Sequence, residues 1–265
     1  MQTEWPGVRL EDDGAGVAEL TLCRPEVLNR VDAEVHESLT EAFRAVAGLD
    51  GVRALVFAST GKAFSAGGDF DFILRQNADP VGRQSLARDA LALLSALLDI
   101  PVPVVVALHG DAMGLGATLV LGADAVVAAR RARLADPHVA IGLVAGDGGC
   151  LVWPQSAGML TAKRYLLTGD ALDAETALRA GLVTDLVDSP EDALPAARAL
   201  AQRIAGLPPL AVQGTKAALN NLQRARFAEV MALSATLEQA SIASDDIREA
   251  VAAFREKRPP AYRGR

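Results

Sequence analysis

The sequence predicts a mixed α/β fold, and three observations support this. Of the 265 residues, 51% are hydrophobic but only 4% are aromatic, so Ala, Val and Leu must build the core. Ala favours helices and Val favours strands. The run Val104-Val105-Val106 is typical of a buried strand. Up to about residue 190 the pattern strand, strand, helix recurs, which indicates a repeated supersecondary unit.

The first hundred residues predict a hairpin, a helix, a strand and a second helix. The hairpin is formed by segments 8–11 and 17–22, which flank Asp13-Gly14. Asp32 is a good N-cap for a helix that continues to Ala47 with one apolar face. A strand over 52–58, a glycine-rich loop from Gly61 to Asp69 and an amphipathic helix over 83–98 follow. They lead into the strand that contains Val104.

The second half of the chain is mostly helical. Short helices are predicted at 165–169 and 173–179, the latter capped by Asp173 and ended by Gly181. A last strand is expected at 183–187. From Glu191 onward we expect four helical segments, at 191–205, 210–221, 227–243 and 245–257.

Composition excludes several classes of function. A formal net charge of −7 argues against a nucleic-acid-binding surface, which needs a basic patch. Cys23 and Cys150 are too few for a disulfide scaffold, and their spacing is not that of a metal site. The first residues have neither the basic nor the apolar region of a signal peptide, and the uncharged stretch 112–123 is too short to cross a bilayer. We therefore expect a cytoplasmic protein that binds neither nucleic acid nor membrane.

Two glycine-rich loops and two ionisable residues form the candidate site. The central strand ends at His109-Gly110, and glycines at 114 and 116 precede an apolar helix. Such a turn and helix N-terminus direct backbone N–H groups at one point, where negative charge is favoured. Further along, His138 and Asp147 lie in glycine-punctuated loops, where functional residues are common.

Several separated motifs resemble the crotonase (enoyl-CoA hydratase/isomerase) superfamily over essentially the whole chain. They are Arg24-Pro25 with Asn29, the loops 61–69, 109–116 and 146–149, and the segments 166–170 and 254–258. The resemblance implies a crotonase-like spiral of ββα units over residues 1–195 that carries the active site. It implies a helical oligomerisation region over 196–265 that builds a trimer or a hexamer. It also implies an acyl-CoA substrate, with no cofactor beyond that coenzyme A and no metal.

The resemblance places an oxyanion hole on the backbone N–H groups of Gly68 and Leu115. Such preorganised donors stabilise a developing enolate oxygen by about 3–4 kcal/mol each. Lys and Arg pair well with phosphate, so basic residues in the matching regions are expected to meet coenzyme A. The residues expected to contact substrate or coenzyme A are Arg24, Lys62, Ala66, Asp69, Gly114, Thr118 and Lys257.

The sequence departs from the superfamily at both catalytic glutamates. Thr118 and His138 stand in their places. A threonine hydroxyl can hold a water, and histidine is the commonest general base. Asp147 is a candidate partner for His138 and alternatively an N-cap of the segment that follows. We expect the other two histidines, His36 and His109, to be structural.

The His138 and Asp147 loops are similar to those of 6-oxocamphor hydrolase, a superfamily member that cleaves a C–C bond of a cyclic β-diketone without coenzyme A. That enzyme is thought to use a second histidine near the oxyanion loop, where this chain has Leu115.

Three hypotheses for the function follow. The first is an acyl-CoA enzyme with an oxyanion-stabilised enolate and His138 as proton carrier. The second is a C–C hydrolase that uses His138 and Asp147. The third is a catalytically silent protein that binds coenzyme A or a partner chain.

Overall fold

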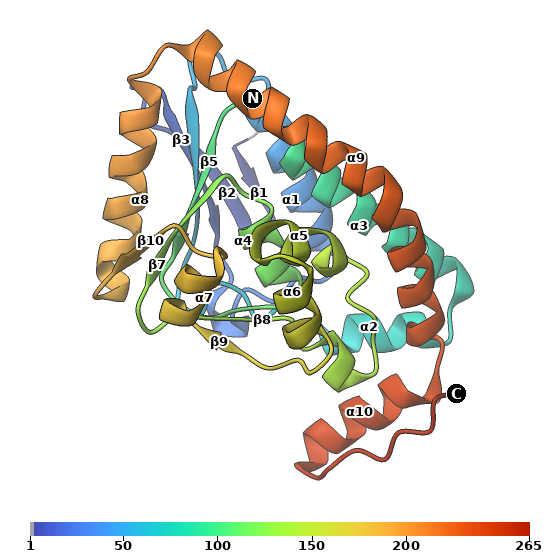
Figure 1. The fold of residues 1–265 in the computed structure, drawn as a ribbon. Coiled ribbons are helices and arrows are strands. Elements are labelled where there is room, and N and C mark those ends of the chain that lie inside the picture. The colour runs from blue at the N-terminus through green and yellow to red at the C-terminus, as the bar shows by residue number, and fades with distance from the viewer. Residues whose placement is uncertain (1–2) are drawn as a thin grey trace.

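The structure is a computed structural model and describes residues 3–265. A seven-stranded sheet forms the centre of the molecule. The strand order is β1-β2-β3-β4-β5-β7-β10, with antiparallel pairing up to β3 and parallel pairing beyond it. The strands are β1 (Glu4–Trp5), β2 (Val8–Asp12), β3 (Val17–Leu22), β4 (Ala54–Ser59), β5 (Val104–Leu108), β7 (Ala125–Ala129) and β10 (Asp185–Val187). The predicted α/β class, hairpin and central strand are confirmed (Figure 1).

Helices cover both faces of this sheet. Helices α1 (Ala33–Val46) and α3 (Pro80–Leu98) pack on one face, and α8 (Pro190–Ala205) packs on the other. Along β4 the side chains alternate, so that Leu55 and Phe57 join the first cluster while Val56 joins the second. The domain boundary expected at residue 195 falls within α8, whose buried alanines belong to the sheet's core.

A small second sheet connects the two glycine-rich loops to the following segment. It consists of β6 (Ala112–Met113), β8 (Arg133–Ala135) and β9 (Leu172–Asp173). Strand β6 runs parallel to β8, and Ala112 also bridges to Ser65 in the first loop. The short 3₁₀ helix η2 (His138–Ile141) comes soon after β8, so this sheet positions the segment that carries His138.

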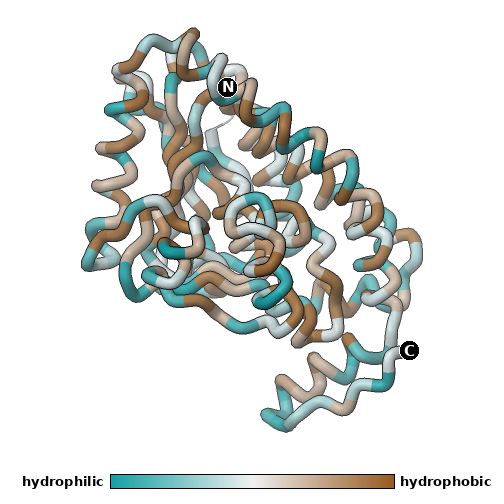
Figure 2. Tube along the Cα trace, in the orientation of Figure 1, coloured by the Kyte–Doolittle hydropathy of each residue, from teal (hydrophilic) through white to brown (hydrophobic). Residues whose placement is uncertain are grey.

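The C-terminal region contains one long helix and one short one. Helix α9 (Pro209–Ile242) is continuous over 34 residues, so the prediction of separate helices at 210–221 and 227–243 is wrong. The intervening residues contain neither Pro nor Gly, and therefore nothing breaks the helix. Hydrophobic and hydrophilic residues alternate along it (Figure 2). Helix α10 (Asp245–Glu256) packs against η2 and α2 (Phe70–Asn77) through a small apolar cluster around Ile247.

The remaining helices are short. They are η1 (Pro25–Val27), α4 (Leu115–Leu121), α5 (Gly149–Ala157), α6 (Met159–Leu166) and α7 (Ala174–Ala180). The prediction of a helix at 165–169 is wrong in its bounds, because the chain turns at Gly169 with a φ of 71°. Asp173 and Gly181 cap α7 as predicted. Within residues 3–265, no helix has the length and apolar character needed to cross a membrane.

Candidate functional site

The two glycine-rich loops lie backbone against backbone. The Met113 N–H donates to the Ser65 carbonyl at 3.0 Å. A Cβ on Gly67, whose φ is +82°, would lie 2.6 Å from the Met113 carbonyl oxygen. A Cβ on Gly116 would lie 2.8 Å from the Ser65 Cβ. Only glycine permits this approach, which brings Gly68 and Leu115 to one cavity.

Gly68 and Leu115 present unpaired backbone amides at a cavity of about 50 Å³. Leu115 is the first residue of α4, where N–H groups have no partner within the helix. Among residues 3–265, neither amide donates a hydrogen bond to the protein. Two free donors that border one cavity are the arrangement expected of an oxyanion hole.

His138 lies beside this second loop with both ring nitrogens near carboxylates. A Cβ on Gly114 would lie 3.4 Å from its Cε1. The Asp136 carboxylate is hydrogen-bonded to Nδ1, and Oδ2 of Asp147 lies 3.6 Å from Nε2. All three side chains are buried. His138 and Asp147 are thus brought together as the sequence suggested, whereas Asp136 was not predicted to take part.

Asp147 is held by α4 and by the start of α5. Its Oδ1 accepts hydrogen bonds from the Thr118 hydroxyl at 3.3 Å and from the Gly149 N–H at 3.4 Å. Thr118 therefore contacts Asp147 through its hydroxyl, the group that can hold a water. The other carboxylate oxygen, Oδ2, is the one that faces His138.

Glu238, on α9, borders the same cavity and was missed by the sequence analysis. It is buried, and it packs so closely on Gly146 that a Cβ there would lie 2.5 Å from the Glu238 Cβ. One feature of the sequence could have identified Glu238 as a candidate site residue. The buried positions Met231, Ser234, Ala235, Glu238 and Ile242 follow helical spacing, and only Glu238 among them is ionisable.

Burial and mutual interaction set the charges of this cluster. Burial by itself lowers the pKa of His138, but the carboxylates of Asp136 and Asp147 outweigh it and raise that pKa to about 10. Burial raises the pKa of Asp147, and the His138 imidazolium opposes this rise. Burial, together with the Asp147 carboxylate, raises the pKa of Glu238 to about 8. At neutral pH His138 is therefore an imidazolium and Glu238 is largely protonated.

His36 also borders the cavity, although we expected it to be structural. It lies on the buried face of α1, and burial lowers its pKa to about 4. His109, by contrast, lies outside the cavity and its Nε2 is 3.0 Å from the Gly61 carbonyl oxygen. That contact ties the end of β5 to the first glycine-rich loop, in keeping with a structural role.

The residues expected to contact coenzyme A do not line the cavity. Arg24 pairs with Asp32 at 2.6 Å. Asp69 accepts from the Phe72 N–H as the N-cap of α2 and pairs with Arg30. Lys62 and Lys257 are exposed at the surface. Ala66 and Gly114 lie on the loops, and their N–H groups donate to the carbonyls of Leu28 and Ala135, respectively.

Asp136, His138 and Asp147 offer donor atoms that all lie within 4.8 Å of one another, as metal ligands do. The Nδ1 of His138 is already hydrogen-bonded to Asp136. The atoms that remain as possible metal ligands are the Nε2 of His138 and a carboxylate oxygen of Asp147. The pKa values of His138 and Glu238 are both raised, and strongly shifted pKa values of this kind cluster at functional sites.

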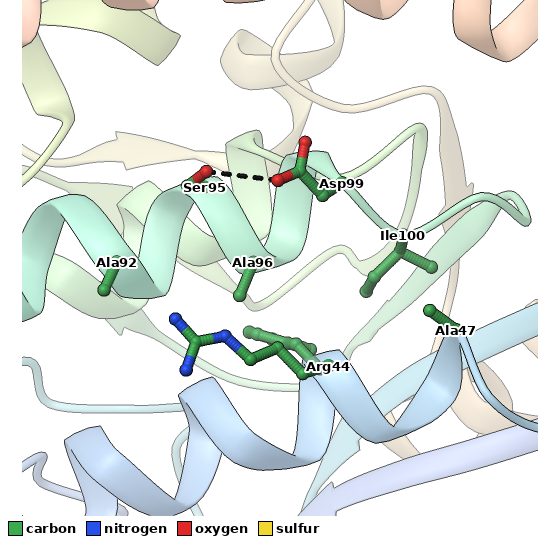
Figure 3. A pocket seen from close by; sticks show the side chains of 8 residues that line it. Arg44, Ala47, Ala92, Ser95, Ala96, Asp99 and Ile100 are labelled. Atoms are coloured by element: carbon green, nitrogen blue, oxygen red, sulfur yellow. Dashed lines mark hydrogen bonds between the residues drawn. The ribbon is translucent and has the colours of Figure 1, made fainter.

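A different cleft, of about 240 Å³, lies between the C-terminal ends of α1 and α3 (Figure 3). Arg44 extends from α1 toward α3, where the Ser95 hydroxyl donates to the Asp99 carboxylate at 3.2 Å. Asp99 also accepts from Arg224 of α9. This cleft contains no pair of free backbone donors and no histidine, so the smaller cavity is the candidate active site.

Comparisons with known proteins identify the family and the fold. The family model described as enoyl-CoA hydratase/isomerase matches residues 12–265. The 1,2-epoxyphenylacetyl-CoA isomerase of Escherichia coli is 34% identical, over 94% of this chain and 96% of the relative. An enoyl-CoA hydratase/isomerase structure from Mycobacterium paratuberculosis has a TM-score of 0.88 and 36% identity, covering 95% of this chain and 98% of the other. A β-diketone hydrolase from Anabaena has a TM-score of 0.84 over 92% of this chain and 96% of its own. At 24% identity it shows a likeness of fold alone.

Proposed function

Because this chain belongs to the enoyl-CoA hydratase/isomerase family, we propose that it acts on an acyl-CoA thioester through an enolate. The observation that supports this most is the pair of unpaired amides, on Gly68 and Leu115, that share a cavity with His138 and Asp147. When a base removes the proton next to the thioester carbonyl, the electron pair moves onto the carbonyl oxygen. The two amides are then the donors for that oxyanion.

His138 and Asp147 are the proposed proton-transfer pair. With a pKa of about 10, His138 is an imidazolium at neutral pH and acts as a proton donor. Asp147 has a raised pKa, so its carboxylate is a stronger base than an exposed aspartate. Asp136 orients the ring by its hydrogen bond to Nδ1, which directs Nε2 toward Asp147. No step in this scheme requires a metal or a cofactor other than the coenzyme A of the substrate.

Glu238 is proposed as a second proton donor in the same cavity. Its pKa of about 8 leaves it largely protonated at neutral pH. A protonated carboxyl can donate a hydrogen bond to a substrate oxygen. It can also return a proton to the electron-rich carbon of the enolate. The acid and base roles that two glutamates perform in the family's hydratases are thus divided here among different residues.

Proton exchange into butanoyl-CoA tests the enolate directly. The enzyme is incubated with butanoyl-CoA in D₂O, and deuterium at the carbon next to the carbonyl is followed by NMR. We expect incorporation with the wild-type enzyme and a loss of about 10²–10⁴-fold in His138→Ala and in Asp147→Asn. His109→Gln, which changes a histidine outside the cavity, is the matched control and should exchange normally. Binding of butanoyl-CoA without exchange would refute the enolate chemistry.

A C–C hydrolase is the second candidate, favoured by the position of Asp147 beside an oriented histidine. In this reaction the Asp147 carboxylate takes a proton from a water, and the water oxygen adds to one ketone carbon of a β-diketone. The C–C bond breaks, its electrons form an enolate held by the amides of Gly68 and Leu115, and His138 supplies the proton to carbon. Hydrolysis of a cyclic 1,3-diketone to a keto acid, without binding of butanoyl-CoA, would support the C–C hydrolase and not the acyl-CoA enzyme. Binding without turnover of either substrate would indicate a silent binding protein.

We further propose that the protein is a homotrimer or a dimer of trimers, formed through its C-terminal helices. Large apolar side chains on and before α9 are exposed, among them Leu207, Leu210, Leu219 and Leu222. An apolar surface of this kind favours association with further copies of the chain. The two cysteines are both free thiols, which is consistent with the proposed cytoplasmic location.

A further inference from the structure

Thr118 lies behind the candidate site and not among the residues that line its cavity. Its side chain is fully buried on α4. A buried hydroxyl needs a partner within the protein, because it has lost its hydrogen bonds to water. Among residues 3–265, the Thr118 hydroxyl donates one hydrogen bond, to Oδ1 of Asp147 at 3.3 Å. Any effect of this hydroxyl on the chemistry therefore passes through Asp147.

The Thr118 hydroxyl helps to determine which oxygen of Asp147 faces His138. Rotation about the last bond of an aspartate side chain interchanges its two carboxylate oxygens, and this rotation is not restricted to narrow wells. Oδ1 accepts hydrogen bonds from the Thr118 hydroxyl and from the Gly149 N–H. Within the described chain, Oδ2 accepts none and lies 3.6 Å from Nε2 of His138. Two donors thus hold one oxygen and leave the other free to exchange a proton.

The methyl group of Thr118 packs on the turn that follows Asp147. A Cβ on Gly148 would lie 2.7 Å from Cγ2 of Thr118, and the φ of Gly148 is 131°. A β-branched side chain in a helix has few χ1 rotamers, so this contact at the methyl group also fixes the direction of the hydroxyl. Thr118 therefore contacts both the carboxylate of Asp147 and the backbone turn beside it.

The helix that carries Thr118 also carries one of the two oxyanion donors. Leu115 is the first residue of α4, and the Thr118 N–H donates to the Gly114 carbonyl at 3.0 Å, which closes the first turn. Leu115 and Thr118 thus lie within one turn of the same helix. The amide proposed to bind the substrate oxygen and the hydroxyl that holds Asp147 therefore belong to one rigid unit.

We propose that Thr118 is a positioning residue, whose hydroxyl fixes Asp147 with Oδ2 directed toward His138 and sets the place of this carboxylate relative to the oxyanion donors. The inference rests on the proposed function, in which Asp147 is the base. A base held in the productive orientation reacts faster than one that must first find it. Loss of the hydroxyl should therefore slow proton transfer and leave binding of the substrate nearly unchanged.

Proton exchange into butanoyl-CoA in D₂O measures this effect. Thr118→Val removes the hydroxyl and keeps the branched shape, and it should lower kcat by about 10–100-fold while KM changes by less than about twofold. Thr118→Ser keeps the hydroxyl and should retain most of the wild-type rate. In an Asp147→Asn background, Thr118→Val should cause no further loss, because the base that Thr118 positions is already absent.

Thr40→Val is the matched control. Thr40 is a buried helical threonine on α1, and its hydroxyl donates to the His36 carbonyl at 2.9 Å. It does not line the cavity, so the variant should exchange protons at the wild-type rate. A loss in Thr40→Val as large as that in Thr118→Val would mean that removal of any buried hydroxyl disturbs the enzyme, and would overturn the proposal.

Crystal structures of the wild-type enzyme and Thr118→Val test the orientation of Asp147 without any substrate. We expect Oδ2 to face Nε2 of His138 in the wild-type enzyme and the carboxylate to adopt a second orientation in the variant. An unchanged carboxylate in Thr118→Val would overturn the positioning role and leave the acyl-CoA function intact, and so would a Thr118→Ser enzyme as slow as Thr118→Val. Absence of exchange in the wild-type enzyme would instead refute the proposed function, and the two crystal structures would still decide the role of Thr118. Should Thr118→Val fail to fold, Thr118→Ala supplies the variant without a hydroxyl.

Discussion

The Nε2 of His138 lies 3.6 Å from Oδ2 of Asp147, while the Nδ1 of the same ring is hydrogen-bonded to the Asp136 carboxylate. The imidazole is therefore held between two buried carboxylates and has only one nitrogen directed toward Asp147. This arrangement raises the pKa of His138 and makes the protonated ring the resting state. We therefore expect the histidine to act as an acid, and a neighbouring carboxylate to act as the base.

His138→Ala and Asp147→Asn should each lower turnover of the true substrate by about 10²–10⁴-fold. The double variant should lose much less than the product of the two losses, because groups that act as a unit are not additive. Steady-state kinetics of the three variants measure this. Ligand affinity should survive in all of them, since the amides of Gly68 and Leu115 remain. Strictly multiplicative losses would mean that the two residues act separately.

Asp136→Asn should lower kcat by about 10²–10⁴-fold with little change in KM. The amide still reaches Nδ1 but cannot stabilise the imidazolium, so the pKa of His138 should fall. A pH–rate profile separates this positioning role from a purely structural one. We expect the basic limb of the profile to move to lower pH in the variant. An unchanged profile with reduced activity would indicate only a disturbed fold.

Stability should fall as pH rises, because the folded state holds two extra protons tightly. Glu238 has a pKa of about 8 when folded, against an ordinary value of 4.5, so its contribution is fully present below pH 4.5 and is lost as pH approaches 8. His138 extends the decline toward its own pKa of about 10. Glu238→Gln should remove a decline of at most about 5 kcal/mol in the free energy of unfolding.

Urea unfolding at pH 5 and pH 8 measures this difference. Glu229→Gln is the matched control, because Glu229 lies on the same helix but at its exposed surface, paired with Arg226. That variant should show the full decline of the wild-type protein. The same decline in Glu238→Gln would show that this carboxyl is not protonated by burial.

Much of the fold could be predicted from local sequence. Asp32, Asp173 and Gly181 act as caps where their residue types prefer to act, and the valine run of β5 is buried as expected. Strand β7 and helices α2 and α5 were not predicted, since segments as short as five, eight and nine residues give little pattern to recognise. Loops 61–69 and 109–116 were predicted to converge, and the hydrogen bond from Met113 to Ser65 is how they do so.

The site was less predictable, because it is completed by residues distant in sequence. Asp136 is two residues from His138, but only the turn into η2 brings its carboxylate back onto the ring. Glu238 reaches the cavity from α9, and His36 from α1. No motif surrounds either residue. Their positions at the cavity follow from packing, which determines which face of each helix meets the two loops.

Crotonyl-CoA hydration should be slow compared with a family member that carries both glutamates. Thr118 offers no base at neutral pH, and the hydroxyl donates to Asp147. Loss of a positioned acid or base costs about 10²–10⁴-fold in rate. The decrease of enoyl absorbance measures hydration, with a two-glutamate hydratase as reference. Rapid hydration that persists in His138→Ala would show that the catalytic groups lie elsewhere.

The apolar surface on and before α9 should bring copies of this chain together. Leu210 is 88% exposed, Leu219 60% and Leu222 67%. Leu219 also lines a groove of about 460 Å³, together with Ile204, Leu207 and Val212. Light scattering should therefore give the mass of a trimer or a hexamer at micromolar concentration. Leu219→Asp should shift the mass toward the monomer, because association would bury an unpaired charge. Val81→Asp is the matched control, since Val81 is 72% exposed on α3, away from this groove, and the variant should keep the wild-type mass. A wild-type protein that stays monomeric would contradict the prediction. Equal effects of Leu219→Asp and Val81→Asp would also contradict it, because the apolar surface of α9 would then not be what holds the copies together.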